Sequence, residues 1–523
     1  MAATVQPGDS GSRYCFGNKQ GILMAGQRKK EFGDFQTPAV LTDQVARFIQ
    51  TIFPAPEIIV EPTCGLGSFL QSCIDVWHTN SSYYGFDINT EYIDICSRKI
   101  ASPVNCHLQA ADFFQQNWQH FFSSAGKSKI LIIGNPPWVT NSALGVLKGS
   151  NLPKKNNFQG LKGFAAKTGK ANFDIAEWML INLLESLPHH CSACLAMLCK
   201  TATARKVLKH AWASQWNISE SSLHRIDAKK YFNVAVDACL FVTFITPEKK
   251  TDFATVYQDV SPANKLSRFG LHGRELIANI DDYTKYSHIE GSCCYTWRSG
   301  IKHDAAKVME LTMQKGKLVN GFHETVAIED RYIYPLLKSS DLGNDRSEPR
   351  KYVLITQRNP SESTKKIQEQ APATWAYLQK YASILDGRKS SIYKKRDKFS
   401  IFGIGEYSFT PWKVAISALY KKLVFVPIGN IDGKPIMVDD TCYFIPCTCE
   451  QEAFLLAKLL NSKVAQRFLH ALIFLDAKRP INIDILKRID INRLADAMGM
   501  KEQVMEYSPC FVQNASPQQL MIF

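Results

Sequence analysis

The sequence predicts an α/β fold: a doubly wound α/β domain first, then a mixed α+β domain. Short apolar runs recur between residues 57 and 134, and each run ends in a glycine-containing, acidic or proline-rich turn. That succession is typical of strands whose carboxyl ends carry the chemistry of an open α/β sheet. The 523 residues, with 45% hydrophobic content, are enough for two large domains.

The first predicted strand is Glu57-Ile58-Ile59-Val60, and it runs into a glycine turn that begins at Glu61 and opens an apolar helix. Glycines there allow the backbone to approach a ligand closely, and a helix N-terminus offers unpaired N–H groups. The turn lacks both G-x-G-x-x-G and G-K-[ST]. With Glu61 beside it, we expect a zwitterionic ligand rather than a pyrophosphate.

The next two predicted strands each end close to an acid. Asp87 closes the apolar run that begins at Tyr83, the usual place for an acceptor of ribose hydroxyls. Asp112 and Phe113 follow a third strand end, where a carboxylate can accept from an adenine amine and a ring can pack on the base. Either acid alone would more simply be a helix cap or a solvated turn. Fitting groups at successive strand ends are harder to explain as packing.

The fourth run, residues 129–134, reads as a buried parallel strand that ends in Asn135-Pro136-Pro137-Trp138. Two prolines remove two backbone donors and stiffen the loop, leaving free carbonyl acceptors. Asn135 adds a side-chain carbonyl, and Trp138 adds a flat apolar face. This set fits a planar heterocycle with an exocyclic NH2 group. A rigid turn without chemistry is the alternative.

These motifs resemble those of gamma-class DNA (adenine-N6) methyltransferases of type II restriction-modification systems. The Asn-Pro-Pro loop matches the family's catalytic motif, although many members carry Tyr where Trp138 stands. Residues 33–38 resemble its N-terminal cofactor motif, and residues 61–69 its glycine motif. The resemblance implies a Rossmann-like S-adenosylmethionine-dependent methyltransferase domain at 31–250, after a flexible tail at 1–30, and a DNA target-recognition domain at 251–523.

The resemblance also assigns roles to individual residues. The expected cofactor-binding residues are Thr37, Pro38, Glu61, Pro62, Cys64, Gly65, Gly67, Asp87, Ile88, Asp112 and Phe113. The expected catalytic residues are Asn135, Pro136, Pro137, Trp138 and Phe232, with Tyr231 as the competitor of Phe232.

The implied reaction follows from the electronics of adenine, whose N6 lone pair is delocalised into the ring. Hydrogen bonds from N6 to the Asn135 side chain and the Pro136 carbonyl would localise that lone pair for attack on the sulfonium methyl. Positioning then supplies most of the catalysis, without a metal, a cysteine nucleophile or a strong base. The base must flip out of the duplex, and we expect Trp138 and Phe232 to sandwich it.

The charge of the chain agrees with a nucleic-acid partner. A formal charge of +14 and a pI near 9.0 favour a polyanion, here double-stranded DNA. Lys154, Lys155 and Lys162 lie in an acid-free stretch after the catalytic loop, and Arg388, Lys394, Lys395 and Arg396 form a second basic group. Solvated charge runs are the alternative for both groups.

Fifteen cysteines, without a signal peptide or an apolar membrane-spanning run, indicate a reduced cytoplasmic protein, prokaryotic if the resemblance holds. His and Cys pairs at 189–194 and 442–449 do not form two well-spaced zinc ligand pairs, so we expect no metal. A separate cognate restriction endonuclease is the expected partner. The sequence does not indicate the oligomeric state.

Three alternatives remain open. Asn-Pro-Pro-aromatic loops also serve RNA adenine and protein glutamine N-methyltransferases, because their target nitrogens pose the same electronic problem. The large basic C-terminal half argues against a glutamine methyltransferase. A non-catalytic DNA-binding scaffold would keep the fold but fail to bind S-adenosylmethionine. Cytosine-N4 enzymes usually begin this loop with Ser, whereas this one begins with Asn135.

Overall fold

The computed structural model describes residues 36–100, 105–126, 128–139, 174–188, 190–247, 250–394, 396–477 and 479–507. It divides into two compact units, Met1–Leu276 and Ile277–Phe523. The expected N-terminal tail lies outside the described residues, as do Lys154, Lys155, Lys162 and Lys395.

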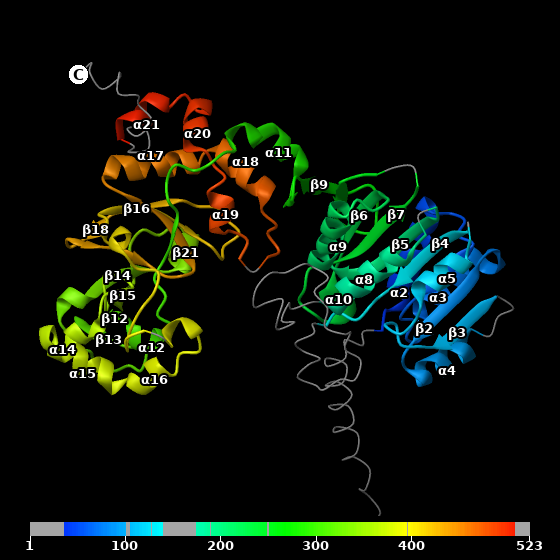
Figure 1. The fold of residues 1–523 in the computed structure, drawn as a ribbon, viewed down its shortest axis with the longest axis horizontal. Helices are drawn as coiled ribbons and strands as arrows, with labels where there is room; N and C mark the ends of the chain where they lie inside the picture. The colour runs from blue at the N-terminus through cyan, green and yellow to red at the C-terminus, as the bar shows by residue number, and fades with distance from the viewer. Residues whose placement is uncertain are drawn as a thin grey trace, which may run out of the picture. The chain divides into compact units, whose positions relative to one another are not determined.

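The first unit is built on a sheet with the strand order β10-β9-β8-β6-β7-β5-β4-β1-β2-β3 among the described residues (Figure 1). Its central parallel strands are β1 (Ile58–Glu61), β2 (Ser82–Asp87), β3 (Cys106–Ala110), β4 (Lys129–Gly134) and β5 (Ser192–Lys200). Next come β7 (Ala238–Ile245) and β6 (Ile218–Ile226), and β7 is antiparallel to both β5 and β6. The predicted doubly wound α/β arrangement is confirmed.

The first unit extends beyond the expected boundary at residue 250. Three further strands continue its sheet: β8 (Phe253–Tyr257), β9 (Lys265–His272) and β10 (Glu275–Ile277). Strand β8 pairs parallel to β6, and β9 pairs antiparallel to β8. These backbone hydrogen bonds bind the segment to the first unit, so the division between the units falls after Leu276.

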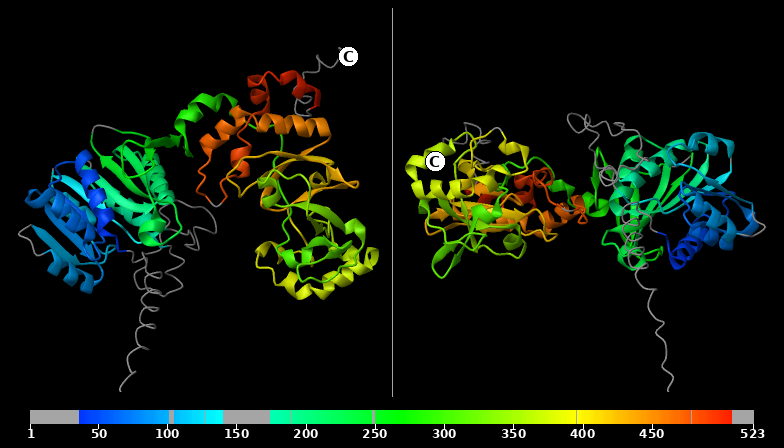
Figure 2. Two further views of the ribbon diagram at one scale, coloured as in Figure 1. Left: turned by 180° about the vertical axis from the view of Figure 1, so that it is seen from behind. Right: turned by 90° about the horizontal axis from the view of Figure 1, so that it is seen from below.

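Helices cover both faces of this sheet (Figures 1 and 2). One face carries α2 (Ala39–Ile52), α3 (Ser68–Trp77) and α4 (Thr90–Lys99), whose apolar side chains share a core with Leu131 and Ile133 of β4. Alternate residues of a strand point to opposite faces, so Ile130 and Ile132 point to the other face. That face carries α5 (Trp118–Ser124), α8 (Ile175–Ser186) and α9 (Thr201–Ala213), and the short α10 (Ala228–Phe232) precedes β7.

The second unit contains two larger sheets and a small hairpin. The sheet β11-β21-β16-β17 consists of β11 (Arg298–Ser299), β16 (Trp412–Ser417), β17 (Val426–Ile428) and β21 (Cys442–Cys447). The sheet β13-β12-β15-β14-β20 consists of β12 (Glu310–Gln314), β13 (Lys317–Val319), β14 (Ile333–Leu337), β15 (Lys351–Leu354) and β20 (Met437–Val438). The hairpin pairs β18 (Asn430–Ile431) with β19 (Lys434–Pro435).

The helices of the second unit divide between these two sheets, as the colours of Figure 2 show. The first sheet is accompanied by α11 (Ile280–Tyr286), α17 (Glu450–Leu460), α18 (Lys463–Leu472), α19 (Ile483–Leu486), α20 (Ile491–Ala497) and α21 (Lys501–Tyr507). The second sheet is accompanied by α12 (Ala306–Met309), α14 (Ile367–Gln370), α15 (Pro372–Lys380) and α16 (Ala382–Asp386), and α13 (Ser339–Gly343) follows β14.

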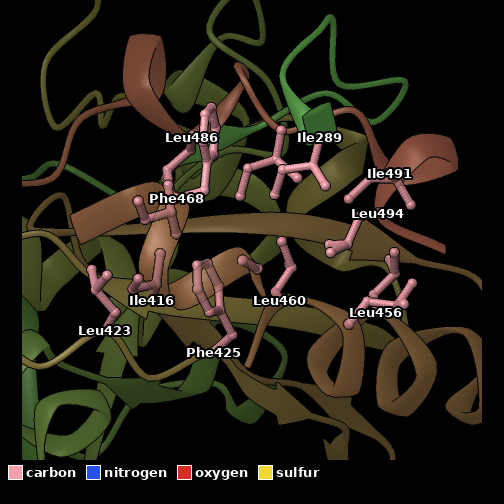
Figure 3. Close-up of a cluster of buried hydrophobic side chains, with 14 of the residues drawn as sticks. Ile289, Ile416, Leu423, Phe425, Leu456, Leu460, Phe468, Leu486, Ile491 and Leu494 are labelled. Carbon is pink, nitrogen blue, oxygen red and sulfur yellow. The ribbon is translucent and has the colours of Figure 1, made fainter. Parts of the chain in front are cut away.

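The largest core of the second unit lies between β16 and helices α17–α20 (Figure 3). The apolar segment 452–473 forms two helices, because Asn461 ends α17 and Ser462 caps α18 through the Ala465 N–H. The Asn461 side chain accepts from the Phe425 N–H at 3.0 Å and donates to the Phe425 carbonyl at 2.7 Å. This break allows α18 to bring Phe468 into the same core.

Phe468→Ala is expected to lower the free energy of unfolding of the second unit by about 3–5 kcal/mol, because the ring is fully buried and its removal leaves a cavity. Phe454→Ala, on α17, is the matched control, since that ring is 52% exposed and should cost about 1 kcal/mol or less. Urea denaturation of both variants measures the difference. Equal losses would contradict the assignment of Phe468 to the core.

Candidate active site

Four predicted site residues lie at one edge of the first sheet. Strands β4, β1, β2 and β3 are neighbours in that order and run parallel. Glu61 ends β1, Asp87 ends β2, Asp112 follows β3 by two residues, and Asn135 follows β4 directly. Carboxyl ends of parallel strands meet at the same edge, which is where ligands bind in such sheets.

The glycine turn after β1 needs its glycines. Gly65 and Gly67 have φ of +51° and +72°, a left-handed conformation that residues with a side chain rarely adopt. Gly67 also caps the N-terminus of α3 without a side chain. A Cβ at Gly67 would lie 2.3 Å from the Cys96 sulfur, and one at Gly65 would lie 2.8 Å from the Gln36 side-chain oxygen. The turn is therefore packed too closely for any larger residue.

Gln36, within the predicted motif at 33–38 but not among the individual residues expected at the site, contacts the glycine turn. Its side-chain oxygen accepts a hydrogen bond from the Leu66 N–H at 3.1 Å, so the segment before α2 holds the glycine turn from outside. The signal was its position directly before Thr37-Pro38 in the N-terminal motif. Thr37 is buried, and Pro38 stands at the N-cap of α2.

The two strand-end acids accept hydrogen bonds from nearby donors, and for Asp87 one of these donors lies in the glycine turn after β1. Asp87 accepts from the Gly65 N–H at 2.9 Å and from the Asn89 N–H at 2.8 Å. Asp112 accepts from the Phe114 N–H and from the Gln115 side chain, both at 3.0 Å. Each carboxylate oxygen has a second lone pair. A carboxylate oxygen can accept more than one hydrogen bond, which suits both acids to ligand hydroxyl or amine groups.

The two apolar residues expected at the cofactor differ in exposure. The Ile88 side chain is 51% exposed beside Asp87. Phe113 is buried, with its ring centroid 5.1 Å from that of Trp118. Its neighbour Phe114 is half-buried, and its ring lies 5.1 Å from that of Trp178 on α8. A cluster of aromatic rings thus lies next to Asp112, and Phe113 is its buried member.

Glu61 is an ionisable group in an apolar place. Its side chain is 3% exposed, and burial raises the pKa of the carboxyl well above 4.5, against a smaller lowering by the Leu70 N–H that it accepts at 3.2 Å. A buried carboxylate becomes favourable when a cation stands beside it. Cys64 is also buried, and its hydrogen bond with Cys96 and its burial raise the pKa of its thiol, which fits a packing role.

The Asn-Pro-Pro-Trp loop is tied to several parts of the first unit. The Asn135 amide nitrogen donates to the Thr37 hydroxyl at 3.2 Å, joining the catalytic motif to the N-terminal motif. The Trp138 indole N–H donates to the Leu198 carbonyl of β5 at 3.3 Å. Lys200, at the end of β5, donates to the Trp138 carbonyl at 2.9 Å. The sequence carries no signal for Lys200 beyond its position at a strand end.

The expected sandwich of Trp138 and Phe232 is not formed in this structure. The two rings contact each other, with centroids 5.2 Å apart and planes at 68°. Both side chains are buried, at 7% and 8% exposure. Two parallel rings around a base need about 7 Å between them, twice the van der Waals contact distance. The structure therefore brings the predicted pair together, but a base between them requires the rings to separate.

Arg388 has an internal role in the second unit instead of lying free on its surface. Its guanidinium donates to the carbonyls of Leu385 at 2.6 Å, Ser400 at 2.7 Å and His303 at 3.2 Å. It also lies 3.7 Å from the ring centroid of Tyr393. These bonds fix the segment that carries Lys394 and Arg396, which are both exposed.

Two further observations concern the chemistry of the described residues. No three His, Cys, Asp or Glu side chains within the described ranges gather as a metal ion would require. Within the same ranges, no helix is both long and apolar enough to cross a membrane.

The strand order and the four polar strand ends are those of a Rossmann-like methyltransferase domain, as the sequence predicts. The fold resembles that of the type IIL restriction-modification enzyme MmeI in complex with DNA, with a TM-score of 0.50 and 11% identity. That likeness covers 89% of this chain and 66% of the MmeI chain, and it concerns the fold alone.

Sequence comparisons identify the family. The family model of the N-6 DNA methylases matches residues 22–195. The chain is 43% identical over 477 residues to the type II methyltransferase M.NspV of a Nostoc species, which covers 89% of this chain and 98% of that protein. It is 28% identical over 114 residues to the modification methylase CviBIII of Paramecium bursaria Chlorella virus NC1A, 22% of this chain and 28% of that protein. The chain belongs to the N-6 DNA methylases, among the type II methyltransferases.

Glu61→Gln is expected to stabilise the protein at neutral pH. Because burial raises the pKa of the folded carboxyl above 4.5, the folded wild type retains a proton that the unfolded chain loses. The free energy of unfolding of the wild type therefore falls as pH rises from 4.5 to the folded pKa, by at most about 1.4 kcal/mol per pH unit. Glutamine keeps the bond from Leu70 and has no such loss.

Denaturation between pH 5 and pH 8 measures the advantage of Glu61→Gln, which should grow with pH. Glu57→Gln, exposed at the amino end of the same strand, provides the baseline. A parallel response of the two variants would refute the assignment of the cost to Glu61.

Proposed function

We propose that this protein is a site-specific DNA methyltransferase that transfers a methyl group from S-adenosylmethionine to N6 of a flipped adenine. The observation that carries the proposal is the place of Asn135, whose loop follows β4 directly beside the strand ends of Glu61, Asp87 and Asp112. Membership of the N-6 DNA methylases supports it independently.

The residues at the sheet edge fit the cofactor. Asp87 would accept from the ribose hydroxyls and Asp112 from the adenine amine, since carboxylate oxygens at the carboxyl ends of neighbouring strands suit both groups. Ile88 and Phe113 would supply apolar contacts to the adenine. When bound, S-adenosylmethionine supplies an electrophilic methyl group on a sulfonium.

The methionine part would lie against the glycine turn and the N-terminal motif. Glu61 would face the positively charged amino group, the cation that its buried carboxylate requires. Pro62, Cys64, Gly65 and Gly67 would form the wall of the turn, and Thr37 with Pro38 would contact the carboxylate. The hydrogen bond between Asn135 and Thr37 would then couple the cofactor side of the site to the reacting base.

The catalytic loop would act by positioning the exocyclic amine. The amide nitrogen of Asn135 donates to Thr37, and its amide oxygen would accept one N6 proton. The Pro136 carbonyl would accept the other, and Pro137 would keep the loop rigid. Both bonds draw the N6 lone pair out of the ring, and holding the reacting atoms close lowers the barrier further.

The rings of Trp138 and Phe232 would separate to admit the flipped base. Each would exchange its present edge-to-face contact for stacking on the base, worth about 1–3 kcal/mol per base. Tyr231 precedes Phe232 at the end of α10 and is half-buried, so it remains the alternative partner.

The basic loop of the second unit, residues 387–398, would contact the DNA backbone. Lys394 and Arg396 are exposed on it, and neither has an ion pair to an acid among the described residues. Arg388 would hold the loop in shape from inside, by its three carbonyl contacts. Lys395, with Lys154, Lys155 and Lys162, would add phosphate contacts. A separate restriction endonuclease that recognises the same site would be the biological partner.

Asn135→Ala is expected to lower the rate of methyl transfer to duplex DNA by about 100-fold or more, because it removes one of two acceptors aimed at the reacting nitrogen. Labelled methyl from S-adenosylmethionine, followed by digestion of the DNA to nucleosides, measures the rate and identifies the product. Asn105→Ala, at the amino end of β3 and exposed, is the matched control and should leave the rate unchanged.

The wild type decides between the proposed function and its alternatives. Label in N6-methyladenine of duplex DNA supports the proposal. Label that enters only RNA, or only a protein amide, replaces it with the corresponding methyltransferase. Absence of label together with absence of S-adenosylmethionine binding leaves a scaffold.

The double variant Lys394→Ala/Arg396→Ala is expected to weaken DNA binding equally for all sequences. Each lost phosphate contact should reduce the slope of log K against log salt by about 0.9, so the double variant should lose about 1.8. Titrations between 50 and 200 mM salt measure the slope. Lys285→Ala/Lys463→Ala removes the same charge from the exposed faces of α11 and α18 and should leave the slope unchanged.

A further inference from the structure

Lys200 lies between the catalytic loop and helix α8. It is the last residue of β5, whose carboxyl end meets the same sheet edge as that of β4, because the two strands run parallel. Its ammonium donates to the Trp138 carbonyl at 2.9 Å and to the Asp174 carboxylate at 2.8 Å. The Lys200 side chain is 25% exposed and that of Asp174 is 8% exposed. The contact is thus shielded from most of the solvent.

The loop depends on contacts from neighbouring elements, because two of its four residues have no backbone donor. Pro136 and Pro137 have no N–H groups, so neither residue can anchor the loop by a backbone hydrogen bond. The loop is tied instead through Asn135 to Thr37 and through the Trp138 indole to Leu198. Both of these bonds join neutral groups. The bond from Lys200 is charge-assisted, and such bonds are roughly twice as strong as neutral ones.

Asp174 extends this connection to helix α8. One of its oxygens accepts from the Ala176 N–H at 3.2 Å and so caps the helix, and the other accepts from Lys200. The next residue, Ile175, donates its N–H to the Val139 carbonyl at 2.9 Å. Lys200, Asp174 and the first turn of α8 therefore hold two consecutive carbonyls at the end of the loop, those of Trp138 and Val139.

A second lysine also forms an ion pair with helix α8, but without a contact to the loop. Lys206, on α9, donates to Glu177 of α8 at 3.0 Å, and Glu177 is almost fully buried. This pair joins helices α8 and α9, and neither Lys206 nor Glu177 belongs to the loop. Lys200 differs because its ammonium reaches the backbone of the catalytic motif itself.

We propose that Lys200 is a positioning residue, which fixes the Asn-Pro-Pro-Trp loop in its reactive geometry through the Trp138 carbonyl and is itself oriented by Asp174. The inference rests on the proposed function, since the geometry that matters is that of Asn135 and Pro136 around the N6 amine. A displacement of about 1 Å in a reacting group can reduce a rate by about 100-fold. A single misplaced carbonyl therefore suffices for a large effect.

The test is single-turnover methyl transfer to duplex DNA at saturating S-adenosylmethionine. Lys200→Met keeps the length and apolar stem of the side chain but removes the donor. We expect its rate to fall by about 10–100-fold, while its affinity for S-adenosylmethionine stays within about two-fold of the wild type. Lys200→Arg keeps a cation that can donate to both oxygens and should recover most of the rate.

Lys206→Met is the matched control, because it removes a lysine from an ion pair with the same helix. Its thermal stability should fall as much as that of Lys200→Met, and its rate should stay within about two-fold of the wild type. Three results would overturn the proposal: a Lys200→Met rate within two-fold of the wild type, an equal slowing by Lys206→Met, or no recovery with Lys200→Arg.

Asp174→Asn keeps the proposal testable if Lys200→Met does not fold. Asparagine still caps α8 but removes the charge that orients Lys200, so a several-fold lower rate is expected and an unchanged rate would count against the proposal. The wild-type reaction separates this inference from the function on which it rests. A wild type that forms no N6-methyladenine overturns the function, whereas an active wild type with an equally active Lys200→Met overturns only the role of Lys200.

Discussion

Parallel pairing of β4, β1, β2 and β3 is the constraint on which the candidate site depends. The register sets Glu61 opposite Gly85, and Asp87 opposite Ala110, so the strands end close to one another. A slip of one residue in any strand would turn its terminal side chain to the other face of the sheet. The apolar interiors of the strands prevent that slip, since it would also expose them. The strand register that buries the apolar core is thus the same register that places the polar side chains at the site.

The catalytic motif carries acceptors but few means of anchoring itself. Prolines give it stiffness and free carbonyls, and the neighbouring elements give it position. Thr37 reaches it from the N-terminal segment, Leu198 and Lys200 from β5, and Ile175 from α8. Three separate pieces of chain therefore hold the four-residue loop and the residue that follows it. A disturbance in any of them reaches the loop without altering a residue of the motif.

Much of the first unit was predictable, because β1, β2 and β4 are short runs rich in apolar residues that end in or directly before a candidate site residue. Strands β8 to β10 were not predicted. In β9, for example, exposed and buried residues follow one another in irregular order, so its sequence shows no apolar run or alternation typical of a strand. Gln36 and Lys200 act through contacts between distant segments, which spacing along the chain does not reveal. Arg388 shows the limit of charge patterns, because a basic residue in a basic run can equally turn inward to backbone carbonyls.

The rings of Trp138 and Phe232 pack edge to face against each other. Under the proposed function, an incoming adenine stacks on the two rings but breaks the contact between them. The net free energy of binding is the difference between these two interactions. An isolated nucleoside has no phosphate backbone to contribute further binding, so it has less free energy with which to separate the rings than a base in DNA has. The contact between the two rings would therefore favour adenine in polymeric DNA over adenine in nucleotides and short fragments.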